Sequence, residues 1–241
     1  MAASATTWSV LEHGPIEQLG ERLWWVQGAI PGMSLKRVMT VVKLESGGLA
    51  IHSAIALREP EQARLEAWGR PELLLVPSTM HRLDAPRYVQ RYPGLRVLAP
   101  AGSRTKVAEV VRVDGTYADF PGDRVLELRT LPGMAEREGV LLVHGEDGLT
   151  LVFNDVVMNM DSKRDLLGYL FTTLLGSAPG PRVSRLSKLV LVKDRAVLRS
   201  ELLRLAALPD LARLIVAHEK VATGRAQARS ALEHAASFLS A

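Results

Sequence analysis

Four polar residues stand directly after apolar runs, at points where a strand would end. They are His52 after GLAI, His81 after ELLLVPSTM, Asp155 after LTLVFN and His218 after LARLIVA. Loops at strand ends gather functional side chains on a rigid scaffold. Because imidazole and carboxylate are ligands that zinc, iron and manganese accept, we predict that these four residues meet around one such ion. A protein without bound metal is an equally weighted alternative.

The chain has 241 residues and no cysteine. The lack of thiols excludes disulfides, thiolate zinc sites and cysteine nucleophiles, so a transition-metal site must use His, Asp or Glu. Each candidate ligand also has an ordinary structural explanation. His52 and His81 could each be buried with one hydrogen bond, Asp155 could cap the turn that follows it, and His218 could lie on the surface. The sequence leaves these alternatives open.

The secondary structure that must position these residues is predicted to be mainly strands at first and mainly helices from near residue 162. The first part predicts short strands and hairpins, because RVMTVVKL and GLAIHSAIAL flank Gly47-Gly48, and GVLLVHG and LTLVFND flank Asp147-Gly148. ELLLVP and LRVLAP read as buried strands separated by helices. A helical stretch begins near residue 162, and a strand at 211–218 precedes a final amphipathic helix. This order predicts one domain over residues 1–241 with a layered α/β sandwich fold.

The order of these segments resembles the metallo-β-lactamase superfamily from about residue 23 to 238. The resemblance lies in RVMTVVKLESGGLAIHSAIAL, PELLLVPSTMHRLDA, RYPGLRVLAPAG, GLTLVFNDVVM and LARLIVAHEKV. HSAIAL and YPGLRVLAPAG are most similar to an uncharacterised branch of it, a domain of unknown function. The resemblance implies a four-layer αββα sandwich and a metal-dependent hydrolase.

The metal-binding motif of that superfamily is degenerate here. Its His-x-His-x-Asp-His positions fall on Ser78, Met80, Arg82 and Leu83, and the histidine expected after a later strand falls on Met134. Methionine is a poor ligand for the metals that suit hydrolysis, and a standard two-metal centre is not expected. Asp155 and His218 stand at ligand positions, and a one-residue shift or a bulge at Pro77 would turn His81 toward them. We expect Ser78, Met80 and Met134 to line the pocket.

Two functions follow from this pattern. The first is a hydrolase-like protein with a degenerate metal site, acting on an ester, thioester, lactone or phosphodiester. The second is a non-catalytic member of the same fold that binds a small molecule or forms a homo-oligomer. A pocket lined by methionine and leucine favours an organic ligand over a cation.

Positive charge is concentrated in the last third of the chain. Residues 161–241 carry 13 Lys/Arg against 7 Asp/Glu, and the densest part is 182–204. We expect a helical basic segment at about 162–206 to cover one side of the domain, as a lid or a dimer contact, and docking on a membrane or on nucleic acid is the alternative. There is no strong nucleic-acid or transmembrane signal, since LLGYLFTTLLG is too short to span a bilayer. The N-terminus lacks a secretory signal, so a cytoplasmic location is expected.

Overall fold

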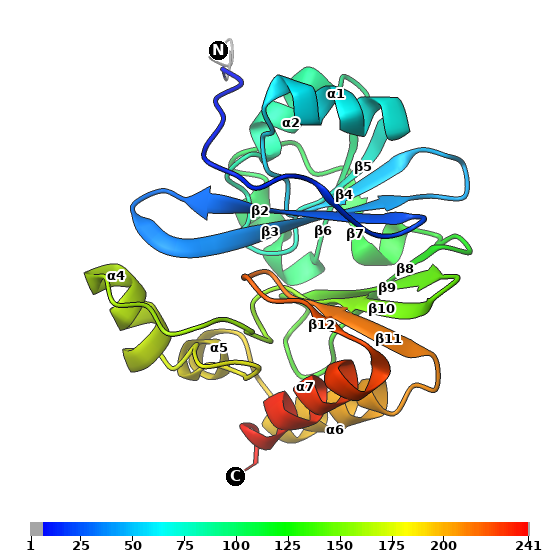
Figure 1. The fold of residues 1–241 in the computed structure, drawn as a ribbon. Helices are drawn as coiled ribbons and strands as arrows, with labels where there is room; N and C mark the ends of the chain where they lie inside the picture. The colour runs from blue at the N-terminus through cyan, green and yellow to red at the C-terminus, as the bar shows by residue number, and fades with distance from the viewer. Residues whose placement is uncertain (1–6, 241) are drawn as a thin grey trace.

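The computed structural model describes residues 7–240, which form two β-sheets packed face to face between two layers of helices (Figure 1). The first sheet has seven strands in chain order. They are β1 (Glu17–Gly20), β2 (Leu23–Ile30), β3 (Met33–Lys43), β4 (Leu49–His52), β5 (Pro71–Leu75), β6 (Arg96–Ala99) and β7 (Gly115–Thr116). The strands from β1 to β4 pair antiparallel, and those from β4 to β7 pair parallel.

The second sheet has five strands in the order β12-β11-β10-β9-β8. They are β8 (Leu126–Thr130), β9 (Gly139–Gly145), β10 (Gly148–Val152), β11 (Leu211–Ile215) and β12 (Ala222–Thr223). β10 and β11 are parallel, and the other neighbours are antiparallel. Both predicted hairpins are confirmed, with Gly47 and Gly148 at positive φ in their turns.

Helices cover the outer faces of the two sheets, and two short helices stand at one end of the sandwich (Figure 1). The helices are α1 (Glu59–Trp68), α2 (Ala85–Arg91), α3 (Arg104–Val107), α4 (Leu166–Tyr169), α5 (Arg185–Val190), α6 (Arg195–Ala206) and α7 (Arg225–Ser237). A π-helical turn, Leu170–Leu174, continues α4, and short 3-10 turns lie at Ala101–Ser103 and Tyr117–Asp119. The four-layer αββα sandwich predicted from the sequence is confirmed.

Three apolar layers hold the sandwich together, because side chains alternate along each strand. On β2, Leu23 and Trp25 point between the sheets, whereas Trp24 and Val26 face the side of α1 and α2. A third cluster packs the second sheet against α6 and α7. β4 is buried on both faces, which explains the consecutive apolar residues Leu49, Ala50 and Ile51.

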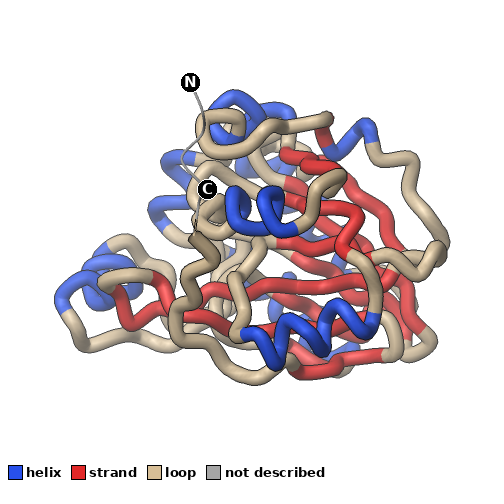
Figure 2. The backbone as a smooth tube through the Cα atoms, turned by 90° about the horizontal axis from the view of Figure 1, so that it is seen from above, coloured by secondary structure: helices blue, strands red, loops and turns tan. Residues whose placement is uncertain are grey.

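The segment from α4 to α5 stands at one end of the sandwich, beside the tip of the β2–β3 hairpin (Figures 1 and 2). The side chain of Ser34 donates a hydrogen bond to Asp165, which caps α4. Leu35, Met158, Met160 and Ala178 form a small buried cluster beneath the segment. The segment is therefore fixed to the hairpin tip, while α6 lies beside α7 on the outer face of the second sheet.

Within residues 7–240, no helix has the length and apolar character needed to cross a membrane.

Candidate metal site

The parallel strand pairs of both sheets deliver the candidate residues to one edge of the sandwich. In the second sheet Val152 of β10 lies opposite Ile215 of β11, and Asp155 and His218 each follow three residues later. In the first sheet His52 of β4 lies opposite Leu75 of β5, beyond which the chain reaches His81. The carboxyl ends of parallel strands lie at the same edge of a sheet, which is the usual place for a site in such folds.

Three of the four candidates form a compact group. The ligand atoms of His81, Asp155 and His218 all lie within 4.8 Å of one another. His81 Nε2 is 2.9 Å from Asp155 Oδ1, and His218 Nε2 is 3.4 Å from the same oxygen. Ligands at about 2.1 Å from a tetrahedral ion lie about 3.4 Å apart, so these separations are close to those around a bound metal. The group could hold a metal ion.

A backbone hydrogen bond fixes a hydrogen on Nδ1 of His218. Its Nδ1 lies 2.9 Å from the carbonyl oxygen of Lys36, which can only accept, so Nδ1 carries a hydrogen. Nε2 then faces the Asp155 carboxylate with either a second proton or a lone pair. The lone pair is the form that binds a metal, and donation of the other ring N–H to a backbone carbonyl is the usual support of a metal-binding histidine.

Asp155 is held by donors on the side away from the histidines. Its Oδ2 accepts hydrogen bonds from Ser78 Oγ at 3.1 Å and from Asn154 Nδ2 at 2.8 Å, which leaves Oδ1 directed at the two imidazoles. Burial by itself would raise the pKa of Asp155, but the facing rings of His81 and His218 hold the pKa well below its usual range. The carboxylate is thus ionised and ready to bind a cation.

A second carboxylate, Glu138, organises the loop around Asp155 from beneath. It is fully buried and accepts hydrogen bonds from the backbone N–H groups of Asn154, Asp155 and Val156, at 2.9, 3.1 and 3.1 Å. Burial and the neighbouring Asp155 charge raise the pKa of Glu138, and the three N–H donors oppose that rise. Glu138 lies outside the three-residue group and acts on it through the backbone.

Ser53 orients His81. Its Oγ lies 3.0 Å from His81 Nδ1, so that Nε2 of the ring is directed at Asp155. Ser53 is buried and has a φ of 57°, in the left-handed region that non-glycine residues rarely adopt. A strained serine at this point is a sign that its contact with His81 is structurally enforced.

His52, a predicted metal ligand, is not one of the three grouped residues. It is 2% exposed and lies within β4, opposite Thr40 of β3. Burial lowers its pKa to about 3, with the charge of His81 adding to the effect and that of Asp155 opposing it. His52 is therefore a neutral core histidine beneath the group. The sequence predicts that His52 lies just beyond the strand, but His52 is the last residue of β4 and the loop begins at Ser53.

A cavity of about 370 Å³ opens beside the three grouped residues. Most of its wall is apolar, and Ser53, Ser78 and Arg37 are among its polar members. The two predicted pocket residues Ser78 and Met80 line it, and Met80 is 80% exposed at the mouth. Met134, the third, lies elsewhere. The turn at Gly133 packs against Leu198 of α6 and directs Met134 into the core under the second sheet, where it is fully buried.

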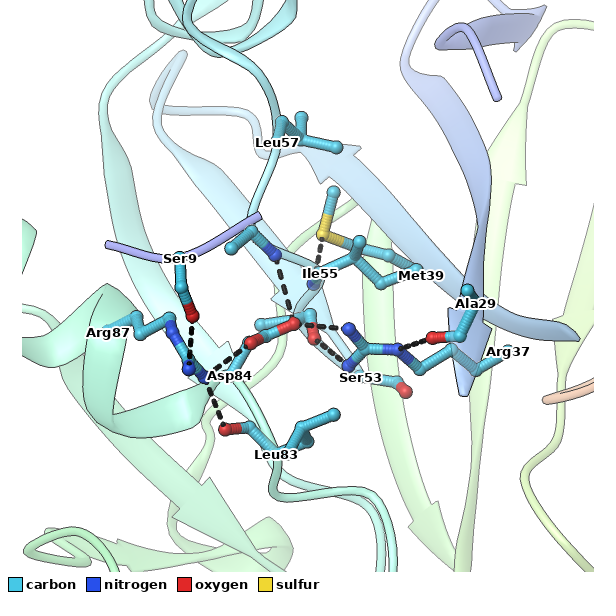
Figure 3. A network of polar contacts seen from close by, with 12 residues as sticks. Ser9, Ala29, Arg37, Met39, Ser53, Ile55, Leu57, Leu83, Asp84 and Arg87 are labelled. Carbon is cyan, nitrogen blue, oxygen red and sulfur yellow. Dashed lines mark hydrogen bonds and ion pairs between the residues drawn. The ribbon is translucent and has the colours of Figure 1, made fainter. Parts of the chain in front are cut away.

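A buried ion pair anchors the loop that carries His81 (Figure 3). The Arg37 guanidinium contacts Asp84, and it also donates to the backbone oxygens of Ala29 and Ala54, both at 3.2 Å. Asp84 accepts from Ala56 N at 3.1 Å and from Arg87 at 2.7 Å. The charges of this cavity wall are thus already compensated, and loop 78–84 is tied to β3.

The sequence reasoning missed the residues that support the group. The strand-end pattern of the sequence does not single out Ser53, Glu138, Asn154, Arg37 or Asp84. Two of them carried a local signal, since Asn154 directly precedes Asp155 and Asp84 follows the His81 loop. Glu138 had none, because its role depends on a loop 16 to 18 residues further along the chain.

Comparison with solved structures identifies the fold. A metallo-β-lactamase from Pontibacter korlensis superposes with a TM-score of 0.60 at 16% identity, over 95% of this chain and 99% of that one. The DIM-1 metallo-β-lactamase gives 0.61 at 13% identity, over 95% and 100%. A metallo-β-lactamase from Hirschia baltica gives 0.56 at 13% identity, over 94% and 98%. The chain therefore has the metallo-β-lactamase fold over nearly its whole length.

At the level of sequence, neither a protein-family model nor a curated protein matches the chain. These structural matches are at 13 to 16% identity, so they define the class of fold. Within that fold, this chain brings together one aspartate and two histidines that could hold a metal ion.

Proposed function

We propose that the protein is a metal-dependent hydrolase with a single metal ion held by His81, Asp155 and His218. The observation that carries the proposal is the arrangement of His218, whose Nδ1–H is bound to the Lys36 carbonyl while Nε2 faces Asp155. A neutral His218 directs its Nε2 lone pair at the Asp155 carboxylate, an arrangement that a cation between the two atoms would stabilise. The structures that share this fold are metallo-β-lactamases, which also supports a metal-assisted reaction.

Different residues of the chain would bind the metal, orient the ligands and hold the substrate. His218 and Asp155 would present one nitrogen and one oxygen from adjacent strand ends, and His81 would supply the third ligand from the first sheet. A divalent ion held there polarises a carbonyl or phosphoryl oxygen and lowers the pKa of a water molecule. Ser78 and Asn154 keep Asp155 Oδ1 directed inward, and the apolar cavity wall excludes bulk water and holds the body of the substrate.

The cavity favours a substrate with an apolar body and a single ester, thioester or lactone group. Its wall has one cationic side chain, Arg37, and that charge is paired with Asp84. A phosphodiester carries one negative charge, and the wall offers it no unpaired Lys or Arg beside the proposed metal ion. The preferred substrates are therefore carboxylic esters and their close relatives.

The test is metal content, measured by elemental mass spectrometry on protein purified without chelator or affinity tag. We expect about one equivalent of zinc, iron or manganese, lost in Asp155→Ala and in His218→Ala. His144→Ala is the matched control, because His144 is an exposed histidine at the turn between β9 and β10. Absence of metal after refilling with excess ion would refute the proposal. If metal is present, a series of p-nitrophenyl esters of increasing chain length tests the reaction class.

A second candidate function is a non-catalytic binding protein. The apolar lining favours it, with the flexible side chains of Met33, Met80 and Met158 around the cavity. Binding of a fluorescent apolar probe that is unaffected by Asp155→Ala, in protein that takes up no metal, would support this alternative.

A further inference from the structure

The segment from α4 to α5 exposes apolar side chains that have no structural need to face water. Leu166 is 84% exposed, Leu174 is 55% exposed and Leu189 is 83% exposed. Leu167, Tyr169, Leu170 and Val190 are also exposed. Scattered surface leucines are ordinary, but seven large apolar residues within 25 positions form a patch of the kind that marks an interaction site. We call residues 163–190 the apolar–basic segment.

This apolar surface is continuous with the wall of the cavity. Phe171 lies between exposed Leu170 and Leu174 and lines the cavity, and Val190 is both exposed and part of the lining. On the other side of the mouth, Met80 and Leu83 are 80% and 43% exposed and also line it. A ligand entering the cavity therefore passes over apolar surface on both sides.

Positive charge accompanies the apolar patch. Between residues 162 and 199 the chain has eight Lys/Arg against two Asp/Glu. Among residues 7–240, the structure pairs neither Arg182, Arg185, Lys188 nor Arg195 with a carboxylate. Burial lowers the pKa of Lys188, and the charges of Arg195, Arg185 and Arg182 lower it further, which shows that these cations lie near one another. The apolar patch thus has an uncompensated cationic border.

The combination selects one kind of partner. A second copy of the same segment would bring like charges together, which opposes a dimer through this face. Single-stranded nucleic acid binds through stacked aromatic rings, whereas the exposed residues here are mainly leucines. Leucines with a cationic border fit the interface of an anionic lipid bilayer, where apolar side chains enter the acyl boundary and Lys/Arg meet the headgroups.

We propose that the apolar–basic segment docks the protein on an anionic membrane surface, with the cavity mouth directed at the lipid. Leu166, Leu170 and Leu189 enter the interface, and the exposed Arg185, together with Arg195 just beyond the segment, meets the headgroups. An acyl chain can then move from the bilayer into the cavity without crossing water. This last step rests on the proposed function and makes the substrate a membrane-derived ester; the docking itself does not depend on the metal site.

The test is cosedimentation of the full chain with vesicles. We expect binding to vesicles of equal parts phosphatidylcholine and phosphatidylglycerol, weak binding to phosphatidylcholine alone, and a steep loss with added salt. Arg185→Glu removes two units of charge, and at about fivefold per charge it should weaken binding about 25-fold. Arg124→Glu is the control, since Arg124 is also exposed, pairs with Glu45 and lies outside the segment.

The leucines are tested separately with the double variant Leu166→Gln/Leu189→Gln, whose exposed positions should leave folding intact. We expect at least a tenfold loss of vesicle binding, with Val110→Gln as the control for an exposed apolar residue elsewhere. Equal binding to neutral and anionic vesicles, or none to either, would overturn the proposal. So would a stable dimer in sedimentation velocity that Leu189→Gln dissociates, or tight binding of single-stranded DNA that the leucine variant leaves unchanged.

Asp155→Ala separates this inference from the proposed function. It should bind anionic vesicles as the unaltered protein does, although it loses metal. Metal binding without vesicle binding would overturn the docking surface alone, and vesicle binding without metal would overturn the hydrolase alone.

Discussion

The two sheets contribute to the candidate site in different ways. The second sheet supplies Asp155 and His218 from matching positions after paired parallel strands, on loops held by backbone contacts to Glu138 and Lys36. The first sheet supplies His81 from a loop that is held by the buried Arg37–Asp84 pair. The positions of Asp155 and His218 thus follow from strand register, and the position of His81 follows from side-chain contacts.

The largest effect should come from breaking the side-chain anchor of loop 78–84. Arg37→Met leaves Asp84 buried with only part of its partners, and removal of one member of a buried ion pair typically costs about 3–5 kcal/mol. We expect that loss in the free energy of unfolding, measured by urea denaturation. Arg22→Met is the control, since Arg22 donates to the Leu44 carbonyl without a buried carboxylate partner. A loss below about 1 kcal/mol would show that the loop is held by other contacts.

Asp155, the proposed metal ligand of the second sheet, is the subject of the next test. Asp155→Asn keeps the shape of the side chain but removes its charge, and we expect the affinity for zinc to fall more than 100-fold, since even outer partners of a ligand are worth about 10–100-fold. Competition against a chelating dye measures the affinity. Asp161→Asn, at an exposed ion pair with Lys220, should leave the affinity unchanged.

A change at Glu138, which holds the backbone around Asp155, should have a smaller effect on zinc affinity. Glu138→Gln replaces one acceptor oxygen by an amide donor that opposes a backbone N–H, and we expect a loss of about 2 kcal/mol in the free energy of unfolding. Zinc affinity should fall by about 10-fold as the loop relaxes. Amide exchange of residues 154–156 should rise in the same variant. Unchanged exchange there would contradict the assigned role of Glu138.

The smallest expected effect is the contribution of the buried His52 to the pH dependence of the free energy of unfolding. The pKa of His52 is about 3 in the folded protein and 6.5 when it is exposed, so below pH 6.5 the unfolded chain binds a proton that the folded chain does not. Stability is complete above pH 6.5 and falls by about 1.4 kcal/mol per pH unit below it. Unfolding of His52→Asn measured from pH 7 to pH 5 should show a shallower slope. Equal slopes would mean that other groups set the acid sensitivity.

The sequence predicts the fold well and the site in part. The hairpins follow from Gly47-Gly48 and Asp147-Gly148, and the buried strands follow from unbroken apolar runs, because these signals are local. Asp155 and His218 could be predicted because each stands at a strand end. His52 and Met134 could not be placed, since one residue decides whether a side chain lies in a strand or in the loop beyond it. Ser53 and Glu138 act through contacts distant in sequence.

The left-handed backbone of Ser53 lowers the stability of the fold, whereas its hydroxyl holds His81 in place. Glycine adopts this backbone at no steric cost, so Ser53→Gly should raise the free energy of unfolding by about 1 kcal/mol. The same change removes the hydroxyl beside His81 Nδ1 and frees the ring to rotate. A selection for thermal stability alone would therefore favour glycine at position 53, and a protein kept for its chemistry has reason to retain the serine.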